Sequence, residues 1–442
     1  MNNEPDGFLG AVVASESLGM TDTMIDGAGG CRSRSQIMLH ELIQEYVPGD
    51  PACCGSKYFS RQSRLPCTYL NGDDFIFGTA PKVSAGVESV SGVTGRRVVL
   101  VDTLGASLLC TDYSGLAHGD VPEPVVLDGD LSGMSFYDGY DSAMSAVLSV
   151  MDLGDGDDGS VNLLGYSIAD PGWEAGAEDL RHLLGLMGVR VNAVPGCMPS
   201  KEEVASMGSA SLNVMVRPEM CGRTAEMLRR RTGTPALRPS QGAPIGYPAI
   251  ASLIREVAVA LGADPAPALE HLRREERRVH SVMMNFDRAP IGMHAKGLAV
   301  DAESSTVLPL LRWMVGAFAM APRRITVRDG TYMPEIRSYL DSMGFADALD
   351  GTEGDVEVTF CDGMTALEGR LRNVPESFVE VRMPRGRHLD LMGRCVVGTR
   401  GCRYILDEMM DNVTRFRCGQ PTEVDYRPDA GGRRPGGGCR GR

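Results

Sequence analysis

Continuous apolar runs alternate with amphipathic stretches along most of this chain. The first long run is RVVLVDT at 97–103, and its β-branched character is typical of a parallel strand buried on both faces. A glycine-containing turn and a predicted helix follow it, in LGASLLCTD at 104–112. Repeated strand–helix steps of this kind predict a doubly wound sheet, because right-handed crossovers place helices on both faces of parallel strands.

The same alternation continues through two further blocks. In the first, the pattern predicts strands at 161–168, 189–194 and 212–216 and helices at 178–187, 201–207 and 219–231. In the second, it predicts strands at 297–302, 324–327, 356–361 and 378–381 and helices at 304–318, 333–343 and 400–412. Ser304 or Ser305 is expected to cap the helix that starts there. A highly charged stretch at 265–278 is expected to form a solvated connecting helix.

The chain has 442 residues, which is too long for a single hydrophobic core. The predicted fold class is α/β, with three Rossmann-like doubly wound parallel-sheet domains. Their expected bounds are 1–157, 158–280 and 281–415, and a stretch rich in Gly and Asp at 152–159 is the expected joint between the first two. The end of the chain, 416–442, is rich in Arg and Gly and is predicted to be a disordered tail.

Composition narrows the classes of partner. The net charge of −14 argues against nucleic-acid binding, because a phosphate backbone would be repelled. The start, MNNEPDG, lacks the features of a signal peptide. No apolar run approaches the roughly 18 residues of a membrane helix. Twelve scattered cysteines suit a reducing compartment. We therefore expect a cytoplasmic protein that binds small molecules or proteins, not membranes. It has no GxxxxGK[ST] loop, so any nucleotide hydrolysis needs a partner.

The stretch FLGAVVASESLGMTDTMIDGAGGC at 8–31 predicts a small-residue helix, a strand and a glycine turn that delivers Cys31. Glycine tolerates positive φ and lets the backbone approach a bulky ligand closely. A thiolate on such a turn suits an iron–sulfur cluster, which cysteines hold and nearby backbone hydrogen bonds tune. A cysteine beside glycines is also commonly a structural core residue, so both interpretations stay open at this point.

Several motifs in a fixed order resemble the nitrogenase component-1 oxidoreductase family. They are the LGA helix with its GxGGC turn, DDFIFG at 73–78, GDLSGMSFYDGYDSAM at 129–144, NLLGYSIADPGW at 162–173, the strand and helix at 211–235, and GTRGCRYILDEMMDN at 398–412. The resemblance covers about residues 8–412. The family includes the molybdenum–iron protein subunits, cofactor-assembly scaffolds, dark-operative protochlorophyllide reductase and the nickel-sirohydrochlorin diamide reductive cyclase of methanogens.

The resemblance implies an iron–sulfur cluster at a subunit interface, to which each chain of the catalytic members gives three cysteines. Cys31 matches the second of these. The first falls at Asp6, which remains a candidate because aspartate ligates iron in one branch of the family, and the third falls near Leu104, which cannot bind iron. Other cysteines could complete the ligand set: Cys67, Cys110 and Cys54, the last beside Cys53.

The family's molybdenum-type cofactor is held by a cysteine and a histidine, whose places are occupied here by Arg217 and Val397. Neither side chain binds a metal in its ordinary state. The chain therefore resembles a β-type or scaffold-type subunit. The remaining later cysteines are interpreted as small core residues: Cys197, Cys221, Cys361, Cys395 and Cys402.

A proton-coupled reduction also needs acid–base groups near its substrate. The candidates are Asp73, Asp74 and His118, with His294 a weaker one. The two aspartates have an alternative role, because paired aspartates at a turn commonly cap a helix, here one starting near Thr79.

Two functions fit these observations. The first is a subunit of a nitrogenase-like, iron–sulfur-dependent reductase complex, which receives electrons from an ATP-dependent iron–sulfur reductase and passes them to a small-molecule or metallocofactor substrate between the three domains. The alternative is a non-catalytic scaffold or carrier for metallocofactor assembly. Both predict an obligate dimer with an α-type relative or with itself, with Cys31 near the interface. A periplasmic-type binding protein fits less well, because the cysteine turn would then have no purpose.

Overall fold

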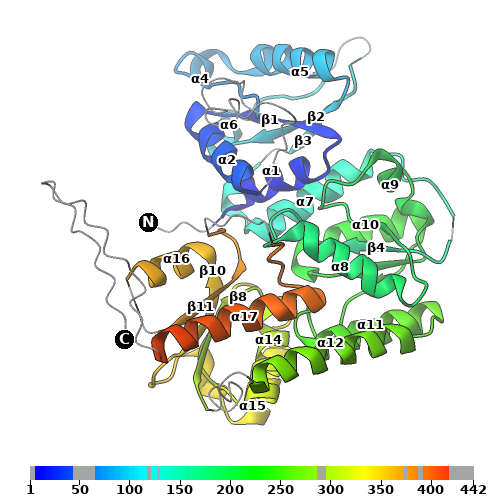
Figure 1. The fold of residues 1–442 in the computed structure, drawn as a ribbon. Coiled ribbons are helices and arrows are strands. Elements are labelled where there is room, and N and C mark those ends of the chain that lie inside the picture. Colours follow the sequence, from blue (N-terminus) through cyan, green and yellow to red (C-terminus); the bar gives the residue numbers. More distant parts are fainter. Residues whose placement is uncertain are drawn as a thin grey trace, which may run out of the picture.

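The computed structural model describes residues 5–42, 65–116, 121–127, 129–156, 158–285, 295–372, 374, 376–386 and 392–417. Three parallel sheets, each covered by helices, make up the fold (Figure 1). The predicted fold class of three Rossmann-like α/β domains is thereby confirmed. Within this described part of the chain, we find no helix with the length and apolar character that a bilayer crossing requires.

The first sheet has the order β1-β2-β3. Its strands are β1 (Thr21–Asp26), β2 (Arg97–Asp102) and β3 (Val125–Leu127), and its helices are α1 (Gly7–Ser17), α2 (Gly29–Leu42), α4 (Asp74–Phe77), α5 (Ala80–Thr94) and α6 (Leu104–Ser107). The central strand β2 is the apolar run predicted at 97–103, and its four middle residues are fully buried. The predicted helix after it is only four residues long.

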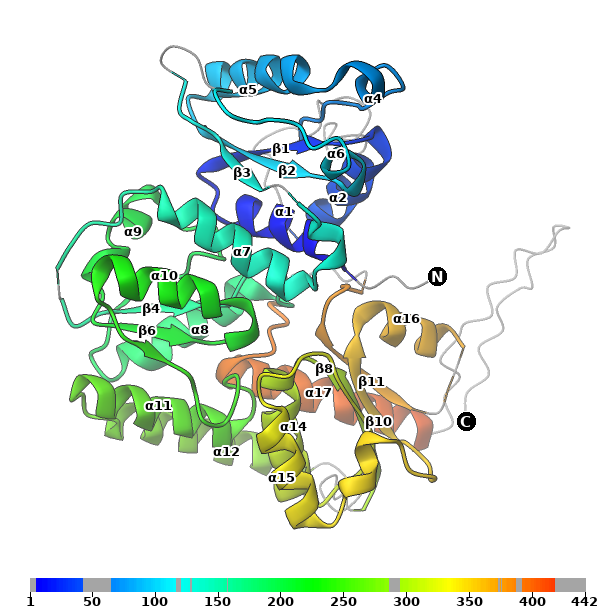
Figure 2. The same cartoon turned by 180° about the vertical axis from the view of Figure 1, so that it is seen from behind.

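Helix α7 (Phe136–Ser149) joins the first sheet to the second (Figure 2). It crosses α1 with the two backbones almost in contact, since a Cβ atom added to Gly139 would lie 2.0 Å from the Gly7 carbonyl oxygen. On its other side, the Asp141 carboxylate accepts the amide hydrogens of Arg223 and Thr224, at 2.6 and 2.9 Å, in the first turn of α10 (Gly222–Thr232). Helix α7 thereby fixes α1 against α10.

The second sheet has the order β5-β4-β6-β7, all parallel. Its strands are β4 (Val161–Leu164), β5 (Val191–Ala193), β6 (Leu212–Met215) and β7 (Ala236–Leu237), and its helices are α8 (Trp173–Gly185), α9 (Lys201–Ala205) and α10. The predicted strands and helices are all present, mostly a few residues shorter or shifted. The two-residue β7 has no counterpart in the sequence prediction, because it is too short to carry a period.

The third sheet has the order β11-β10-β8-β9, also all parallel. Its strands are β8 (Gly297–Ala302), β9 (Ala321–Val327), β10 (Val358–Asp362) and β11 (Ser377–Arg382), and its helices are α14 (Ser304–Phe318), α15 (Met333–Met343), α16 (Gly363–Leu371) and α17 (Gly398–Arg417). The expected serine cap of α14 is wrong, because Glu303 occupies the N-cap position. The hydroxyls of Ser304 and Ser305 instead donate to Asp329 and Glu219.

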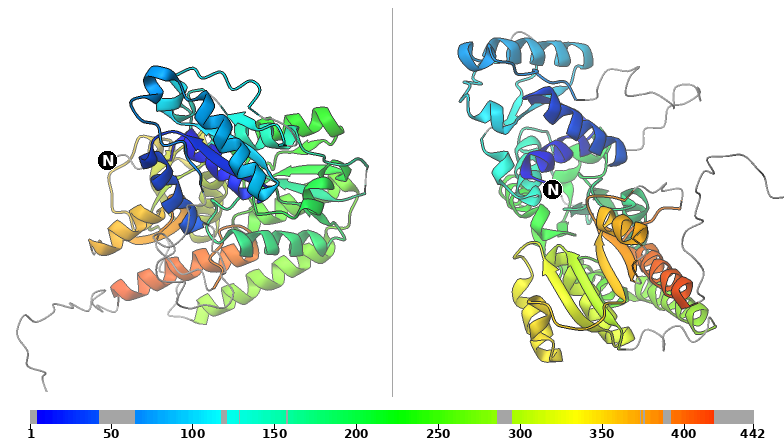
Figure 3. Two further views of the ribbon diagram at one scale, coloured as in Figure 1. Left: turned by 90° about the horizontal axis from the view of Figure 1, so that it is seen from above. Right: turned by 90° about the vertical axis from the view of Figure 1, so that its left-hand side faces the viewer.

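Helices α11 (Tyr247–Leu261), α12 (Ala266–Asn285) and α17 pack together along one side of the second and third sheets (Figures 1 and 3). The helix predicted at 265–278 is observed as α12, although one face is buried through Ala268 and Leu272. An ion pair joins Arg403 of α17 to Glu275 of α12. Four short 3₁₀ helices complete the described elements: Leu131–Gly133, Met207–Ser209, Pro218–Met220 and Ala346–Leu349.

The three sheets fall inside the ranges 1–157, 158–280 and 281–415 that the sequence predicts for the domains. These bounds stay a prediction, because α7 packs on elements of both the first and the second range. The predicted tail at 416–442 lies outside the described residues, apart from the last two residues of α17.

Candidate functional site

The candidate site lies at the carboxyl edge of the first sheet, where β1 and β2 end side by side. Asp26 and Asp102 stand opposite each other in the register. The amide and hydroxyl of Thr103 both donate to the Asp26 carbonyl oxygen, at 3.0 Å each. A Cβ atom on Gly27 would lie 2.3 Å from Thr103 Cγ2, so glycine is required there by this close approach. A positive φ, which glycine would tolerate in the predicted turn, is not found at Gly27, Gly29 or Gly30.

Cys31 is the third residue of α2, in the first turn of the helix. The predicted four-residue glycine turn is shorter in the structure, because α2 already begins at Gly29 and the Cys31 amide donates to the Ala28 carbonyl oxygen at 3.1 Å. The side chain is half-buried. A helix N-terminus favours negative charge, so this position suits a thiolate that binds a metal.

Cys67 reaches the same edge from a segment that lies along β1. The amide of Ile25 donates to the Pro66 carbonyl oxygen at 2.9 Å, and the amide of Thr68 donates to the Ile25 carbonyl oxygen at 3.1 Å. The Cys67 thiol donates to the Gly27 carbonyl oxygen at 3.1 Å, and the Tyr69 amide donates to Cys67 Sγ at 3.4 Å. The glycine turn before Cys31 and the segment around Cys67 therefore hold each other in place.

The two thiols are close enough to affect each other electrostatically. Burial raises the pKa of Cys67, and the neighbouring Cys31 and Asp26 raise it further, while the Tyr69 amide and the Arg32 guanidinium oppose them. Arg32 also lies over the Tyr69 ring, 5.2 Å from its centroid. The predicted pair Cys31 and Cys67 is therefore brought together by the fold, with a cation beside it.

A buried polar cluster supports this edge from below. The Tyr113 hydroxyl lies 2.9 Å from Asp26 Oδ2 and 2.8 Å from Asp102 Oδ1, and the Thr68 hydroxyl donates to Asp26 Oδ1 at 2.6 Å. Burial and the two carboxylates raise the pKa of Tyr113 far above its ordinary value, so the phenol keeps its proton. This cluster was not predicted from the sequence. Its only signal was an aspartate at the end of each of two strands, where parallel sheets place functional groups.

The other predicted ligands lie less favourably. Asp6 caps α1, with the Leu9 amide donating to its carboxylate at 3.0 Å, and it pairs with Arg34 of α2 at 3.4 Å. Leu104 is the first residue of α6 and is exposed. Cys110 was expected on the helix after β2, but it lies beyond α6 in an exposed turn with φ of 48°. Cys53, Cys54, His118 and His294 lie outside the described residues.

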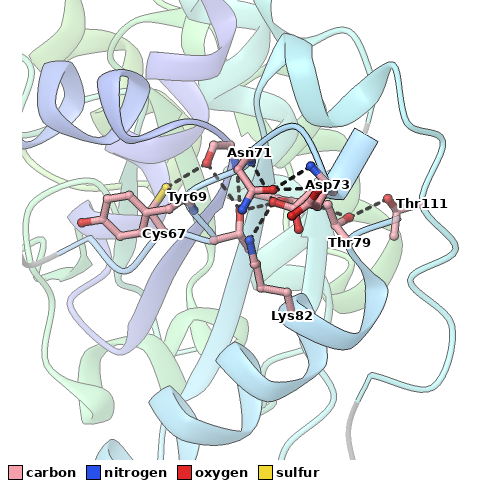
Figure 4. A network of polar contacts seen from close by, with 11 residues as sticks. Cys67, Tyr69, Asn71, Asp73, Thr79, Lys82 and Thr111 are labelled. Atoms are coloured by element: carbon pink, nitrogen blue, oxygen red, sulfur yellow. Dashed lines mark hydrogen bonds and ion pairs between the residues drawn. The ribbon is translucent and has the colours of Figure 1, made fainter. Parts of the chain in front are cut away.

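Asp73 and Asp74 belong to a network around α4 (Figure 4). Asp74 Oδ2 accepts from the Asn71 amide and from Lys82 Nζ, both at 2.7 Å, and Lys82 lowers the pKa of Asp74. Asp73 takes the N-cap position of α4 without a side-chain capping bond, and Thr79 takes that of α5. The expected capping by these aspartates is therefore not seen. An ionised Asp74 held by lysine has no proton to give at neutral pH.

Exposed apolar side chains occur on the elements at this edge of the first sheet, and we call them the thiol-edge apolar surface. They come from the Cys67 segment, α4, α6 and the turn after α6: Tyr69, Phe75, Ile76, Phe77, Leu104 and Leu108. The elements adjoin, since a Cβ atom on Gly105 would lie 3.9 Å from the Phe75 ring and one on Gly29 would lie 3.0 Å from the Tyr69 ring. Contiguous exposed apolar patches on proteins commonly mark interaction sites.

The thiols at this edge can be compared with what an iron–sulfur cluster requires. Such clusters take four cysteine-type ligands. Among the residues that the structure describes, no three His, Cys, Asp or Glu side chains gather in a way that could hold a metal ion. Cys31 and Cys67 therefore stand at this edge as two thiols beside a glycine turn and an arginine, within the part of the chain that the structure describes.

The two positions matched to the molybdenum-type cofactor are both buried. Arg217 is 3% exposed, and its Nε and Nη1 donate to Asp170 Oδ1 and Thr306 Oγ1, each at 2.5 Å. Val397 is fully buried in the segment before α17. Of the later cysteines, Cys197 is half-buried and the other four are buried: Cys221, Cys361, Cys395 and Cys402. Burial raises the pKa of all five thiols, as expected of core residues.

Comparisons with known proteins agree with this architecture. Among curated proteins, one subunit of the light-independent protochlorophyllide reductase of Rhodospirillum rubrum is 41% identical over 184 residues, which cover 41% of this chain and 32% of that protein. The same subunit from a Synechococcus strain is 26% identical over 227 residues, covering 51% of this chain and 39% of that protein. The chain thus spans well under half the length of these curated relatives.

Solved structures show the same fold. The structure described as nitrogenase Cp1 at pH 6.5 superimposes with a TM-score of 0.74 at 15% identity, covering 96% of this chain and 94% of that one. A second, at pH 5, has a TM-score of 0.64 at 14% identity, covering 95% and 90%. The family described as nitrogenase component 1 type oxidoreductase matches residues 7–414. The chain belongs to this family.

Proposed function

We propose that this chain is a subunit of a nitrogenase-like, iron–sulfur-dependent reductase complex, in which Cys31 and Cys67 bind a cluster shared with a second chain. The observation that carries the proposal is the hydrogen bond from the Cys67 thiol to the Gly27 carbonyl oxygen, at 3.1 Å, which holds Cys67 against the glycine turn that leads to Cys31. A rigid pair of thiols suits a cluster, because ligands held in place lose little freedom when the metal binds.

A second chain is needed for two reasons. Two thiols leave half of a four-ligand set open. The thiol-edge apolar surface exposes Phe75, Ile76 and Phe77 by 53%, 73% and 82%, and covering such side chains stabilises an assembly. The second chain is an α-type relative or another copy of this chain. Asp6, Cys110 and Cys54 remain proposed further ligands, and Asp6 lies beside α2 through its ion pair with Arg34.

Electrons reach the cluster from an ATP-dependent iron–sulfur reductase in this proposal, because the chain has no phosphate-binding loop of its own. The name of the curated relatives, as one subunit of a light-independent reductase, supports both the reaction type and the need for other subunits. The complex is placed in the cytoplasm, since the eight cysteines in the described part of the chain are all free thiols.

A scaffold or carrier for metallocofactor assembly is the second candidate. It is favoured by Asp74, one of the two acid–base candidates in the described residues, because Lys82 holds it as a carboxylate and it is no proton donor there. A carrier needs a cluster but no proton donor, whereas a reductase needs both.

The test is anaerobic purification of the chain together with the products of neighbouring genes, followed by iron and sulfide analysis and electron paramagnetic resonance. A reductase subunit contains a cluster whose signal changes when a reductase partner and ATP are added. A carrier contains a cluster that leaves on incubation with an acceptor protein and shows no such change. A folded complex without iron or sulfide would overturn both proposals.

A further inference from the structure

The buried polar cluster at the end of β1 and β2 needs one hydrogen more than its phenol can supply. Tyr113 Oη lies between two carboxyl groups, 2.9 Å from Asp26 Oδ2 and 2.8 Å from Asp102 Oδ1. Both distances are those of O–H···O hydrogen bonds, so each contact needs its own hydrogen. A phenol supplies one hydrogen, and an ionised carboxylate supplies none. The second hydrogen has to come from one of the two carboxyl groups.

The hydroxyl groups around Asp26 make it the ionised member of the pair. Asp26 Oδ1 accepts from the Thr68 hydroxyl at 2.6 Å, and Asp26 Oδ2 accepts from the Thr79 hydroxyl at 3.3 Å. Hydrogen bonds donated to a carboxylate favour its charged form. Tyr113 therefore donates to Asp26 as a third hydroxyl, and the second hydrogen lies on Asp102, which donates it to Tyr113 Oη.

Burial makes a second negative charge costly in this place. Asp26 and Asp102 are both almost completely buried. Two carboxyl groups that share a buried site do not both ionise readily, because like charges repel strongly where water is excluded. Burial, and then the charges of Asp102 and Asp26, raise the pKa of Tyr113, so the phenol does not give up its own hydrogen instead. Other contacts of Asp102 do not change the number of hydrogens that the three oxygens need between them.

From the two short contacts, the hydroxyls around Asp26 and the burial, we propose that Asp102, Tyr113 and Asp26 form a proton store, in which Asp102 keeps a proton at neutral pH. The store can pass a proton along its length. The Asp102 hydrogen moves to Tyr113 Oη while the Tyr113 hydrogen moves to Asp26. Asp102 ends as a carboxylate, Asp26 ends as an acid and the phenol is unchanged, so one proton has moved and no other reactant is needed.

Asp26 is the end of the store that acts on the thiol edge. Burial raises the pKa of Cys67 most, and the charge of Asp26 adds to the rise. Thr68, which donates to Asp26, is also the next residue after Cys67. A proton that reaches Asp26 therefore lowers the negative charge beside Cys67. The store would give a reductase the acid that Asp74 cannot supply; this use rests on the proposed function, whereas the presence of the proton does not.

Infrared spectroscopy of the full-length chain, in the complex with which it purifies, tests whether the proton is there. A protonated carboxyl group has a C=O band at a frequency where carboxylates do not absorb, and this band shifts in D₂O. Spectra of the unchanged chain, Asp102→Asn and Asp26→Asn are compared at about pH 7, where an ordinary aspartate is ionised.

Each variant should lose a band equal to one protonated carboxyl group per chain. The new amide N–H supplies the second hydrogen, so the remaining carboxyl group no longer has to carry it and stays ionised. The amide has the shape of the carboxyl group that it replaces, so both variants are expected to fold, which thermal melting checks. Glu219, whose pKa burial raises to about 8, is protonated in all three proteins and cancels in the difference spectra.

Asp22→Asn is the matched control on the same strand. The Asp22 carboxylate accepts from the hydroxyl of the exposed Thr94 at 2.6 Å and lies 3.8 Å from Arg96. It has an ordinary donor and a cation beside it, so no second carboxyl group competes for a hydrogen there. The difference spectrum between Asp22→Asn and the unchanged chain should show no protonated carboxyl group.

A folded Asp102→Asn or Asp26→Asn that keeps the full band would overturn the proposal, since both carboxyl groups would then be ionised and share the single phenolic hydrogen. If neither variant folds, the unchanged chain is labelled with ¹³C at its aspartate carboxyl groups. A protonated-carboxyl band that moves with the label supports the proton store, and the absence of any such band overturns it. Iron content is measured on the same samples, so a missing proton is distinguishable from a missing cluster.

Discussion

Arg217 Nε lies 2.5 Å from Asp170 Oδ1, and the two side chains are 3% and 5% exposed. The pair ties the loop after β6 to the loop after β4, at the edge where both strands end. Burial raises the pKa of Asp170, and the guanidinium of Arg217 opposes this rise. Each charge is tolerated in the interior only because the other is there.

Removing one partner should therefore be costly. We expect Arg217→Met to lower the free energy of unfolding by about 3–5 kcal/mol, because the Asp170 carboxylate is left buried without its cation. The double variant Arg217→Met/Asp170→Asn should recover much of the loss, since the amide is neutral and its oxygen can still accept from the Ser167 amide. Urea unfolding of the purified protein measures both.

Arg372→Met is the control for this experiment. Arg372 forms an exposed ion pair with Glu368 on one helix, and such pairs contribute about 0–1 kcal/mol. If Arg217→Met and Arg372→Met lost equal free energy of unfolding, burial of the Arg217–Asp170 pair would not increase its contribution to stability.

One buried carboxyl group, that of Glu219, makes the free energy of unfolding depend on pH. Glu219 Oε1 accepts from the Ser305 hydroxyl at 2.6 Å, and burial together with the charge of Asp329 raises the pKa of Glu219 to about 8. The unfolded chain loses this proton near the ordinary pKa of 4.5, whereas the folded chain keeps it until about pH 8. The free energy of unfolding should therefore fall as the pH rises between these values, by at most about 1.4 kcal/mol per pH unit.

Glu219→Gln carries the neutral form at every pH, so it should remove this part of the slope. Urea unfolding between about pH 5 and pH 8 tests it. Glu226→Gln is the control, because Arg229 and Arg230 lower the pKa of Glu226 to about 2 and the group is charged in both states across that range. A slope unchanged in Glu219→Gln would show that Glu219 is ionised in the folded protein.

Much of the fold could be predicted because its signals are local. β8 and α15 coincide with the predicted 297–302 and 333–343, since each carries a complete apolar period within itself. β3 has three residues and β7 has two, so neither strand is long enough to carry an apolar period. The cap of α14 was mispredicted because Asp329 and Glu219, 25 and 86 residues from the two serines, already accept their hydroxyls.

The candidate site could be predicted only in part, because only part of it has a local signal in the sequence. Cys31 stands in a recognisable glycine motif, and its role as a cluster ligand stays a prediction. That Cys67 lies beside it depends on the backbone pairing of its segment with Ile25, more than 40 residues away, which has no local signature. The buried pair of Asp170 and Arg217 is less visible still, because the two residues are 47 positions apart and meet only when β4 and β6 lie side by side.

The contact of α1 with α7 can be tested at Gly139. A Cβ atom there would lie 2.0 Å from the Gly7 carbonyl oxygen, and backbone cannot move aside as a flexible side chain can. We expect Gly139→Ala to lower the free energy of unfolding by about 1–3 kcal/mol or more, as overpacking does. Gly92→Ala is the matched helical control: nothing lies within 4 Å of its added Cβ, and alanine stabilises an exposed helix by up to about 1 kcal/mol. A stable Gly139→Ala would contradict this account of the contact.

Cys31→Ser tests the thiol site most directly. A serine hydroxyl is a far poorer iron ligand than a thiolate, and a cluster with few ligands from this chain cannot replace one that is lost. We expect Cys31→Ser and Cys67→Ser to lower the iron bound per chain and to abolish electron transfer. Cys361→Ser, at a cysteine that is 1% exposed in the third domain, should change stability slightly and leave the iron content alone. All three are purified anaerobically and compared by iron analysis and by absorbance in the thiolate-to-iron bands. If Cys31→Ser stays folded and keeps its full iron, Cys31 is a packing residue, and neither the cluster nor the reductase proposal can rest on it.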